Sequence, residues 1–264
     1  MNKIISLIVI YLITISCVKI PITEVKPIIT NINNTWCFIM VGQSNMAGRA
    51  IVESTDNFMI SNRIKFIDPS NNILIAQEPL HRYEPNIAGL DCGLSFATEL
   101  LKKIPDSINI LLIPCAIGGT GIDEWNNDQV HANIQLLTNL TTKVNIAKHY
   151  GIIKGLLWHQ GENDANGNTI NYEAKLKSVF NKIRTISNND SLPIYAGELP
   201  TFDIKRFGTW YMNINNTLNS IQLEDKNVHI ISTNDFTDVG DSLHFDSKSQ
   251  REFGKRFANE IKIN

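Results

Sequence analysis

The segment Gly42-Gln43-Ser44-Asn45-Met46-Ala47-Gly48 follows directly on an apolar run, residues 36–41. That run is short, uncharged and rich in aromatic and β-favouring residues, so it predicts a buried strand that ends at the Gly42 turn. Where a strand turns into a helix, a serine hydroxyl can face solvent while the following amides point at the same spot. Ser44 is therefore a candidate nucleophile with part of an oxyanion hole beside it. The alternative is that Ser44 only caps a short helix.

Further apolar segments alternate with helical patterns along the chain. The expected strands are residues 36–41, 109–114, 152–157, 193–197 and 228–232. The expected helices are residues 94–103, 133–149, 172–186, 210–221 and 247–261. This alternation predicts an α/β fold: a central parallel sheet covered on both faces by helices, in a three-layer α/β/α sandwich. Residues 50–88 show little periodicity and are expected to form long loops over the active face, where substrate choice is made.

The composition limits the classes of function. The chain has 264 residues, 43% of them hydrophobic, which is enough to build one core and one domain. A net charge of −2 without a basic run gives no electrostatic footprint for nucleic acid, so no such partner is expected. The six histidines are scattered without metal-ligand spacing, and we expect neither a metal nor another cofactor. Beyond Cys17, three cysteines without CxxC spacing allow at most one disulfide.

The N-terminus has the pattern of an export signal. Lys3 precedes the apolar residues 4–15, which are too few to span a bilayer but fit a secretory signal. We therefore expect residues 1–17 to be a signal peptide, residues 18–34 a tether and residues 35–264 the folded domain, at a secreted, periplasmic or cell-surface location. Cys17 directly after Ser16 also fits a bacterial lipoprotein signal, which would put a lipid anchor at Cys17.

Near the C-terminus, Asp241-Ser242-Leu243-His244 places a carboxylate three residues before a histidine. A histidine that takes a proton from serine must be held in one tautomer, and such a carboxylate can hydrogen-bond its far ring nitrogen. The motif therefore supplies a candidate base, His244, and its orienter, Asp241. The alternative is that His244 is an ordinary loop residue and that Asp246 only caps the last helix.

Two more expected strands end in segments that suit a ligand site. Gly118-Gly119 follows the strand at 109–114, and paired glycines let backbone N–H groups approach a developing oxyanion, although a tight turn would explain them too. The strand at 152–157 leads into Trp158-His159-Gln160-Gly161-Glu162-Asn163-Asp164, and open α/β sheets bind ligands at such strand ends. There Gln160 can donate to an oxyanion and Glu162 can pin a neighbouring loop. His159 lacks an aspartate partner and is expected to be a packed residue.

These segments together resemble a known family. Residues 42–48, Gly118-Gly119-Thr120, residues 158–162 and residues 241–244 look like the four signature blocks of the sialate O-acetylesterase/acetylxylan esterase family, carbohydrate esterase family six within the SGNH hydrolases. The resemblance covers about residues 36–258. The first and third blocks are specific to the family, whereas the glycine pair and Asp-x-x-His are common. The resemblance implies the flavodoxin-like architecture of SGNH hydrolases.

Carried over position by position, the resemblance also implies the catalytic residues. Ser44 would be the nucleophile, His244 the base and Asp241 its orienter. Asn45 and Glu162, which belong to the first and third blocks, would support them.

The implied oxyanion hole comprises the N–H groups of Ser44 and Gly119 and the side chain of Gln160. The choice between Gly118 and Gly119 stays open. Gln160 stands where many SGNH enzymes use an asparagine, as is usual for this subfamily, and the alternative is that it only braces the loop. Met46 occupies the second glycine position of a Gly-x-Ser-x-Gly elbow, which disfavours an α/β-hydrolase.

The residues and the resemblance predict a serine esterase that removes O-acetyl groups from a carbohydrate, the acetyl specificity coming from the resemblance alone. One alternative is an SGNH lipase or thioesterase that acts on other acyl esters. Another is a non-catalytic carbohydrate-binding protein of the same fold, although a binding module has no use for the full catalytic set. Trp125, Trp210 and Tyr211 are candidates to stack on a sugar or, equally, to fill the core. No protein partner is implied.

Overall fold

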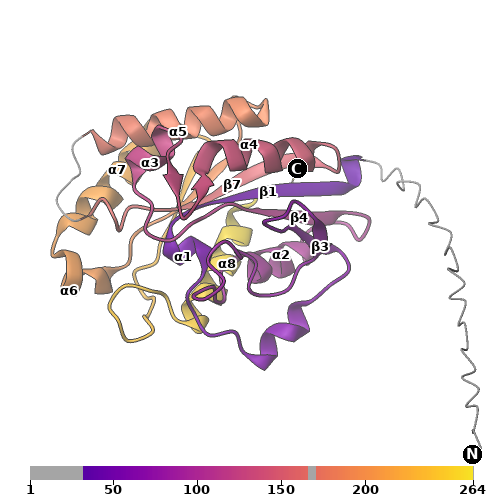
Figure 1. The fold of residues 1–264 in the computed structure, drawn as a ribbon, viewed down its shortest axis with the longest axis horizontal. Coiled ribbons are helices and arrows are strands. Elements are labelled where there is room, and N and C mark those ends of the chain that lie inside the picture. Colours follow the sequence, from indigo (N-terminus) through magenta and orange to yellow (C-terminus); the bar gives the residue numbers. More distant parts are fainter. Residues whose placement is uncertain (1–31, 166–170, 264) are drawn as a thin grey trace, which may run out of the picture.

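A seven-stranded sheet in the order β3-β2-β4-β1-β7-β8-β9 forms the middle layer (Figure 1). The computed structural model describes residues 32–165 and 171–263. The strands of this sheet are β1 Thr35–Gly42, β2 Ile64–Ile67, β3 Ile73–Ile75, β4 Asn109–Pro114, β7 Ile152–His159, β8 Ile194–Gly197 and β9 Val228–Ile231. The pairs from β2 through β9 run parallel, and β3 joins β2 antiparallel at one edge.

Helices cover both faces of this sheet (Figure 1). They are α1 Ser44–Ala47, α2 Gly93–Leu101, α3 Ile122–Asn126, α4 Leu136–Lys148, α5 Tyr172–Ser187, α6 Ile204–Phe207, α7 Trp210–Glu224 and α8 Ser247–Glu260. One hydrophobic core contains side chains of α3, α4, α5 and α7, and the other contains side chains of α1, α2 and α8. Alternate residues of β1 serve the two cores: Ile39 and Val41 face the first, Phe38 and Met40 the second. The expected three-layer α/β/α sandwich is confirmed.

The position of β1 determines where a site can form. It pairs with β4 on one side and β7 on the other, and the register sets Met40 beside Pro114 and Gly42 beside His159. The segments that follow these three strands therefore leave the sheet at the same edge. β2, β3 and β4 lie on one side of β1 and the later strands on the other. Such a switch point opens the crevice where α/β sheets bind ligands.

Residues 50–88 differ from the long loops expected there. They contain β2, β3 and the 3-10 helix η2 Ser54–Met59. With four and three residues, β2 and β3 are too short for a period-two pattern to stand out in the sequence. The helix expected from residue 133 begins only at Leu136, because a small hairpin, β5 Val130–His131 and β6 Ile134–Gln135, precedes it.

The expected signal peptide, residues 1–17, and most of the tether lie outside the described residues. Residues 32–34 of the tether form η1 Ile32–Asn34, and η3 Thr201–Asp203 precedes α6. Among the helices of the described segments, none is long and apolar enough to cross a membrane.

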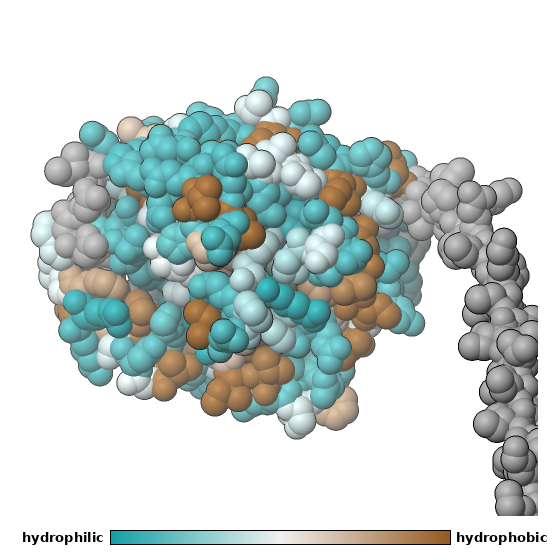
Figure 2. Space-filling view, viewed as in Figure 1, coloured by the Kyte–Doolittle hydropathy of each residue, from teal (hydrophilic) through white to brown (hydrophobic). Residues whose placement is uncertain are grey.

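Cys37, Cys92 and Cys115 are buried and free, so the fold is stabilised by its two cores. The face seen in Figure 2 is mainly hydrophilic, with apolar side chains scattered over it.

Candidate active site

Ser44 begins α1 immediately beyond the end of β1. The turn between them passes close to β7: Gln43 N–H donates to the carbonyl of His159 at 3.0 Å, and a Cβ on Gly42, at φ +152°, would lie 1.9 Å from that oxygen. Only glycine fits at this crossing. The turn brings Ser44, 6% exposed, to the wall of a pocket of about 460 Å³.

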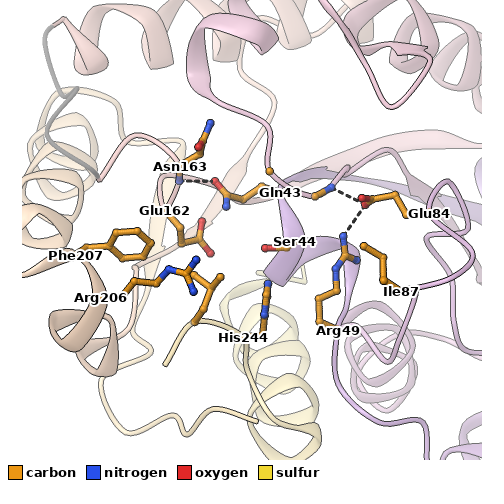
Figure 3. A pocket seen from close by; sticks show the side chains of 13 residues that line it. Gln43, Ser44, Arg49, Glu84, Ile87, Glu162, Asn163, Arg206, Phe207 and His244 are labelled. Carbon is orange, nitrogen blue, oxygen red and sulfur yellow. Dashed lines mark hydrogen bonds and ion pairs between the residues drawn. The ribbon is translucent and has the colours of Figure 1, made fainter. Parts of the chain in front are cut away.

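His244 reaches the same pocket from the loop before α8, with its ring directed toward Ser44 (Figure 3). Its Nδ1 lies 2.6 Å from Oδ2 of Asp241, whose Oδ1 accepts the N–H groups of Leu243 and His244 at 2.9 and 2.8 Å. Burial raises the pKa of Asp241, but the hydrogen bonds from His244 and Leu243 outweigh it and lower that pKa below its ordinary value. The charged carboxylate leaves Nε2 as the ring nitrogen that can take a proton. Asp246, by contrast, caps α8.

Asn45, directly after the candidate nucleophile, joins three parts of the site. Its side chain is fully buried, and Nδ2 donates to Oε1 of Glu162 at 2.7 Å and to the carbonyl of Leu243 at 3.0 Å. Its Oδ1 accepts the N–H of Phe245 at 2.9 Å. Leu243 and Phe245 flank His244, so one amide holds the loop on both sides of the candidate base.

The glycine pair after β4 uses its two N–H groups differently. Gly118 N–H donates to Oε2 of Glu84 at 2.7 Å and is not available to a substrate. Gly119, at φ +74°, lines the pocket, and no acceptor among the described residues takes its N–H. The N–H of Ser44 is likewise without a protein acceptor in the described part of the chain, as is usual for a first helical residue. Of the two glycines, the geometry favours Gly119 as the oxyanion donor.

Gln160 does not reach the pocket. It is fully buried, and its Nε2 lies 2.5 Å from Oδ2 of Asp164, 3.1 Å from the carbonyl of Thr120 and 3.3 Å from Oε1 of Gln43. Its Oε1 accepts the hydroxyl of Tyr172 at 3.1 Å. Two amide hydrogens facing three protein acceptors leave none for a substrate. This geometry disagrees with the oxyanion role expected for Gln160 and supports the alternative that it braces the loop.

Gln43 and Asp164 hold the turn after β7 from two sides. Oε1 of Gln43 accepts the N–H groups of Asn163 at 3.1 Å (Figure 3) and Gly161 at 3.4 Å. Oδ2 of Asp164 accepts the N–H of Ile122 at 3.0 Å, at the start of α3. Burial, only partly offset by the hydrogen bonds that it accepts, raises the pKa of Asp164 to about 6.

The sequence analysis missed the charged residues of the pocket wall. Nη2 of Arg49 pairs with Oε2 of Glu84 at 2.6 Å on one side, and Arg206 of α6 extends from the other side next to Phe207 (Figure 3). Arg49 directly follows the first motif and could have been noticed, whereas Glu84 and Arg206 lie in segments without a motif. The described residues contain no group of three or more His, Cys, Asp and Glu side chains arranged to hold a metal ion.

The aromatic candidates for sugar stacking lie elsewhere. Trp125 is fully buried, and its Nε1 donates to the Thr120 hydroxyl at 3.0 Å, so it belongs to the core. Trp210 and Tyr211, on α7, do not line the pocket in the described structure. His159 is also fully buried, and burial lowers its pKa, which suits a packed neutral residue better than a base.

The chain is similar to a known protein family and to several solved structures. Residues 34–262 match a family model described as carbohydrate esterase, sialic acid-specific acetylesterase. A probable carbohydrate esterase of Arabidopsis thaliana is 32% identical over 176 residues, which are 60% of this chain and 66% of that protein, just under two thirds of its length. The X-ray structure of the same plant protein has a TM-score of 0.74 at 24% identity, over 86% of this chain and 97% of that one. The crystal structure of NanS has a TM-score of 0.67 at 16% identity, over 86% and 96%. The structural likenesses establish the fold.

We expect Gln160→Ala to lower Tm by about 5–10 °C, because losing a buried, fully hydrogen-bonded side chain costs roughly 2–4 kcal/mol. KM and kcat should change by similar factors as the turn after β7 loosens. An oxyanion donor would instead lose about 10²–10³ in kcat at unchanged Tm. Melting curves and steady-state kinetics on an acetyl ester separate the two results. Asn215→Ala is the control, since Asn215 braces the backbone of Leu199 outside the pocket.

The raised pKa of Asp164 predicts a pH-dependent loss of stability. This carboxyl titrates near 3.8 when unfolded and near 6 when folded, so its contribution to stability falls as the pH rises between those values. The difference is worth roughly 3 kcal/mol. Asp164→Asn can keep an acceptor oxygen in the same place but cannot ionise. We expect its Tm relative to wild type to increase from about pH 4 to about pH 6.5. Parallel melting temperatures across that range would contradict the assignment.

Proposed function

The chain belongs to the sialic acid-specific acetylesterase family of carbohydrate esterases, as its four sequence blocks implied, and we propose that it hydrolyses O-acetyl esters of carbohydrates through Ser44, His244 and Asp241. One observation carries the mechanism. Nδ1 of His244 lies 2.6 Å from the Asp241 carboxylate, and His244 lines the same pocket as Ser44.

In the first half-reaction, Ser44 Oγ attacks the acetyl carbonyl carbon while Nε2 of His244 takes the hydroxyl proton. Asp241, ionised because its pKa is lowered, accepts the Nδ1–H bond and stabilises the imidazolium that forms. The carbonyl oxygen becomes an oxyanion within reach of the N–H groups of Ser44 and Gly119. Collapse of the intermediate breaks the bond to the sugar oxygen, which takes the proton from His244 and leaves acetyl-Ser44.

In the second half-reaction, water takes the place of the sugar. His244 accepts a proton from the water as its oxygen attacks the acetyl-Ser44 carbonyl. The same N–H groups stabilise the second oxyanion. Collapse releases acetic acid, which gives its proton to solvent and becomes acetate, and His244 returns the other proton to Ser44 Oγ, so the enzyme is regenerated without any other reactant.

The charges of the pocket wall support an acidic sugar of the sialate type over neutral xylan. Arg206 lines the pocket beside the ring of Phe207, and none of the carboxylates whose side chains the structure describes pairs with it. Arg49, in contrast, is neutralised by Glu84 at 2.6 Å. A guanidinium offers planar, paired donors that match a carboxylate. Arg206 is therefore our candidate for the residue that binds the substrate's carboxylate.

Ser44→Ala should lower kcat by several orders of magnitude and leave Tm within a few degrees, because the hydroxyl contributes little to packing. Asp241→Asn should lower kcat by up to about 10⁴, since an amide favours the wrong imidazole tautomer. Acetate release measures both. The controls are Ser95→Ala, a buried serine outside the pocket, and Asp246→Asn, a cap that asparagine can replace. Near wild-type turnover in Asp241→Asn would refute its role, and equal rates on acetyl and octanoyl esters would favour the lipase-like alternative.

Arg206→Gln should raise KM by at least about tenfold for an O-acetylated sialoside, because a charge-assisted hydrogen bond is worth about 1.5–3 kcal/mol. KM for acetylated xylan, which offers no carboxylate, should stay within twofold. Lys205→Gln is the matched control, a cation on the same short helix that does not line the pocket. An equal change of KM on both substrates would mean that Arg206 does not select an acidic sugar.

A further inference from the structure

Arg49 and Glu84 connect the two turns that face the proposed oxyanion (Figure 3). Arg49 donates from Nη1 to the carbonyl of Gly48 at 2.8 Å, at the end of α1, and from Nη2 to Oε2 of Glu84 at 2.6 Å. The same carboxylate oxygen accepts the N–H of Gly118 at 2.7 Å. One carboxylate therefore links the nucleophile turn to the glycine pair.

The loop that carries Glu84 is itself fixed to the nucleophile turn. The carbonyl of Glu84 accepts the N–H of Ala88 at 2.9 Å, and the N–H of Gly89 donates to the carbonyl of Gly48 at 3.2 Å. The Arg49 and Glu84 side chains are only 10% and 20% exposed. The Arg49 side chain and the loop that carries Glu84 are thus both held by the carbonyl of Gly48, at the end of α1.

The Arg49–Glu84 pair lies directly against Gly118. A Cβ on Gly118 would lie 2.2 Å from Nη2 of Arg49 and 2.9 Å from Oε2 of Glu84. Gly119 then turns the chain at φ +74°. The contact with Glu84 and this turn together set the direction of the peptide between the two glycines, whose N–H belongs to Gly119.

The other contacts of this turn hold its two ends. Ile117 N–H donates to the carbonyl of Gly42 at 3.3 Å, and the single hydroxyl hydrogen of Thr120 faces that carbonyl at 3.2 Å and the carbonyl of Ile117 at 3.0 Å. Both therefore join the turn to the end of β1. Between these anchors, the hydrogen bond from Gly118 to Glu84 holds the middle of the turn.

We propose that Glu84, oriented by Arg49, is a positioning residue that aims the Gly119 N–H at the developing oxyanion. The proposal rests on the function proposed above, because it requires an oxyanion in this pocket. The competing explanation is an ion pair that only stabilises the fold. A donor misplaced by about 1 Å can cost about 10² in rate, and an interaction made only in the transition state acts on kcat rather than on KM.

The test compares melting curves and steady-state kinetics on an acetyl ester for wild type, Ser44→Ala, Glu84→Ala, Glu84→Gln and Asp225→Ala. Asp225 provides a matched control, because it also accepts a guanidinium, from Arg184 at 2.5 Å, and a backbone N–H, from Asn227 at 2.9 Å. The side chains of this pair are 10% and 26% exposed, close to those of Arg49 and Glu84. Asp225 does not line the catalytic pocket.

Glu84→Ala should lower kcat about 10²-fold with KM within a few-fold. Asp225→Ala should lower Tm about as much as Glu84→Ala does, but leave kcat unchanged. The kcat of Glu84→Gln should be at least about tenfold higher than that of Glu84→Ala, because the glutamine amide oxygen can still accept the Gly118 N–H. The kcat of the double variant Arg49→Ala, Glu84→Ala should lie within about twofold of the kcat of Glu84→Ala, since the two residues act through one contact.

Two kinds of failure are distinguishable. If wild type hydrolyses the ester and Ser44→Ala does not, the proposed function stands. In that case, unchanged kcat in Glu84→Ala, or a folded Glu84→Gln that recovers no kcat, overturns the positioning role alone. A wild type inactive on acetyl esters, or a fully active Ser44→Ala, overturns the proposed function and this inference with it.

Discussion

The buried side-chain amide of Asn45 uses both of its N–H groups and its oxygen in hydrogen bonds to two segments 117 to 200 residues away in the chain. In a low-dielectric interior such bonds are stronger than in water, and an unpaired partner is costly, so the arrangement is strongly preferred. The loop that carries His244 has one antiparallel bridge of its own, between Asp238 and Phe245. Asn45 directly follows Ser44, so its side-chain amide connects the His244 loop to the nucleophile turn and sets the position of the candidate base relative to Ser44.

The sheet and the polar contacts above it have separate roles in the site. Parallel pairing brings the ends of β1, β4 and β7 to one edge, and two apolar cores hold the sheet there. Apolar packing is non-directional, so it cannot orient an individual N–H group. Hydrogen bonds can orient such a group. Gln43 accepts N–H groups of the turn after β7, and Glu84, on a neighbouring loop, accepts an N–H of the turn after β4. Donors held in this way need no reorganisation as charge develops on a substrate.

How far the sequence predicts this molecule depends on how local each feature is. β4 was expected at residues 109–114 and lies there, because an apolar run is recognised from neighbouring residues. Asp241 and His244 were expected to pair, being three residues apart, and lie 2.6 Å apart. The contact of Glu84 with Gly118 joins residues 34 positions apart, so no local pattern indicates it. Gln160 was assigned from its position in a motif, but the direction of its amide depends on acceptors from other segments.

The two arginines of the pocket wall lie in different surroundings. Arg49 is paired with Glu84 at 2.6 Å, so the charges largely cancel and the pair acts through its geometry. In the proposed function, its positive charge is then not free to hold an anionic substrate close to Gly119, where it would compete with the placement of the acetyl group. Arg206 lines the opposite wall, where none of the carboxylates whose side chains the structure describes pairs with it, and we propose that its charge serves a ligand. In the proposed function, stabilisation of the oxyanion by neutral N–H groups and recognition of charge on the sugar are thus assigned to different parts of the pocket.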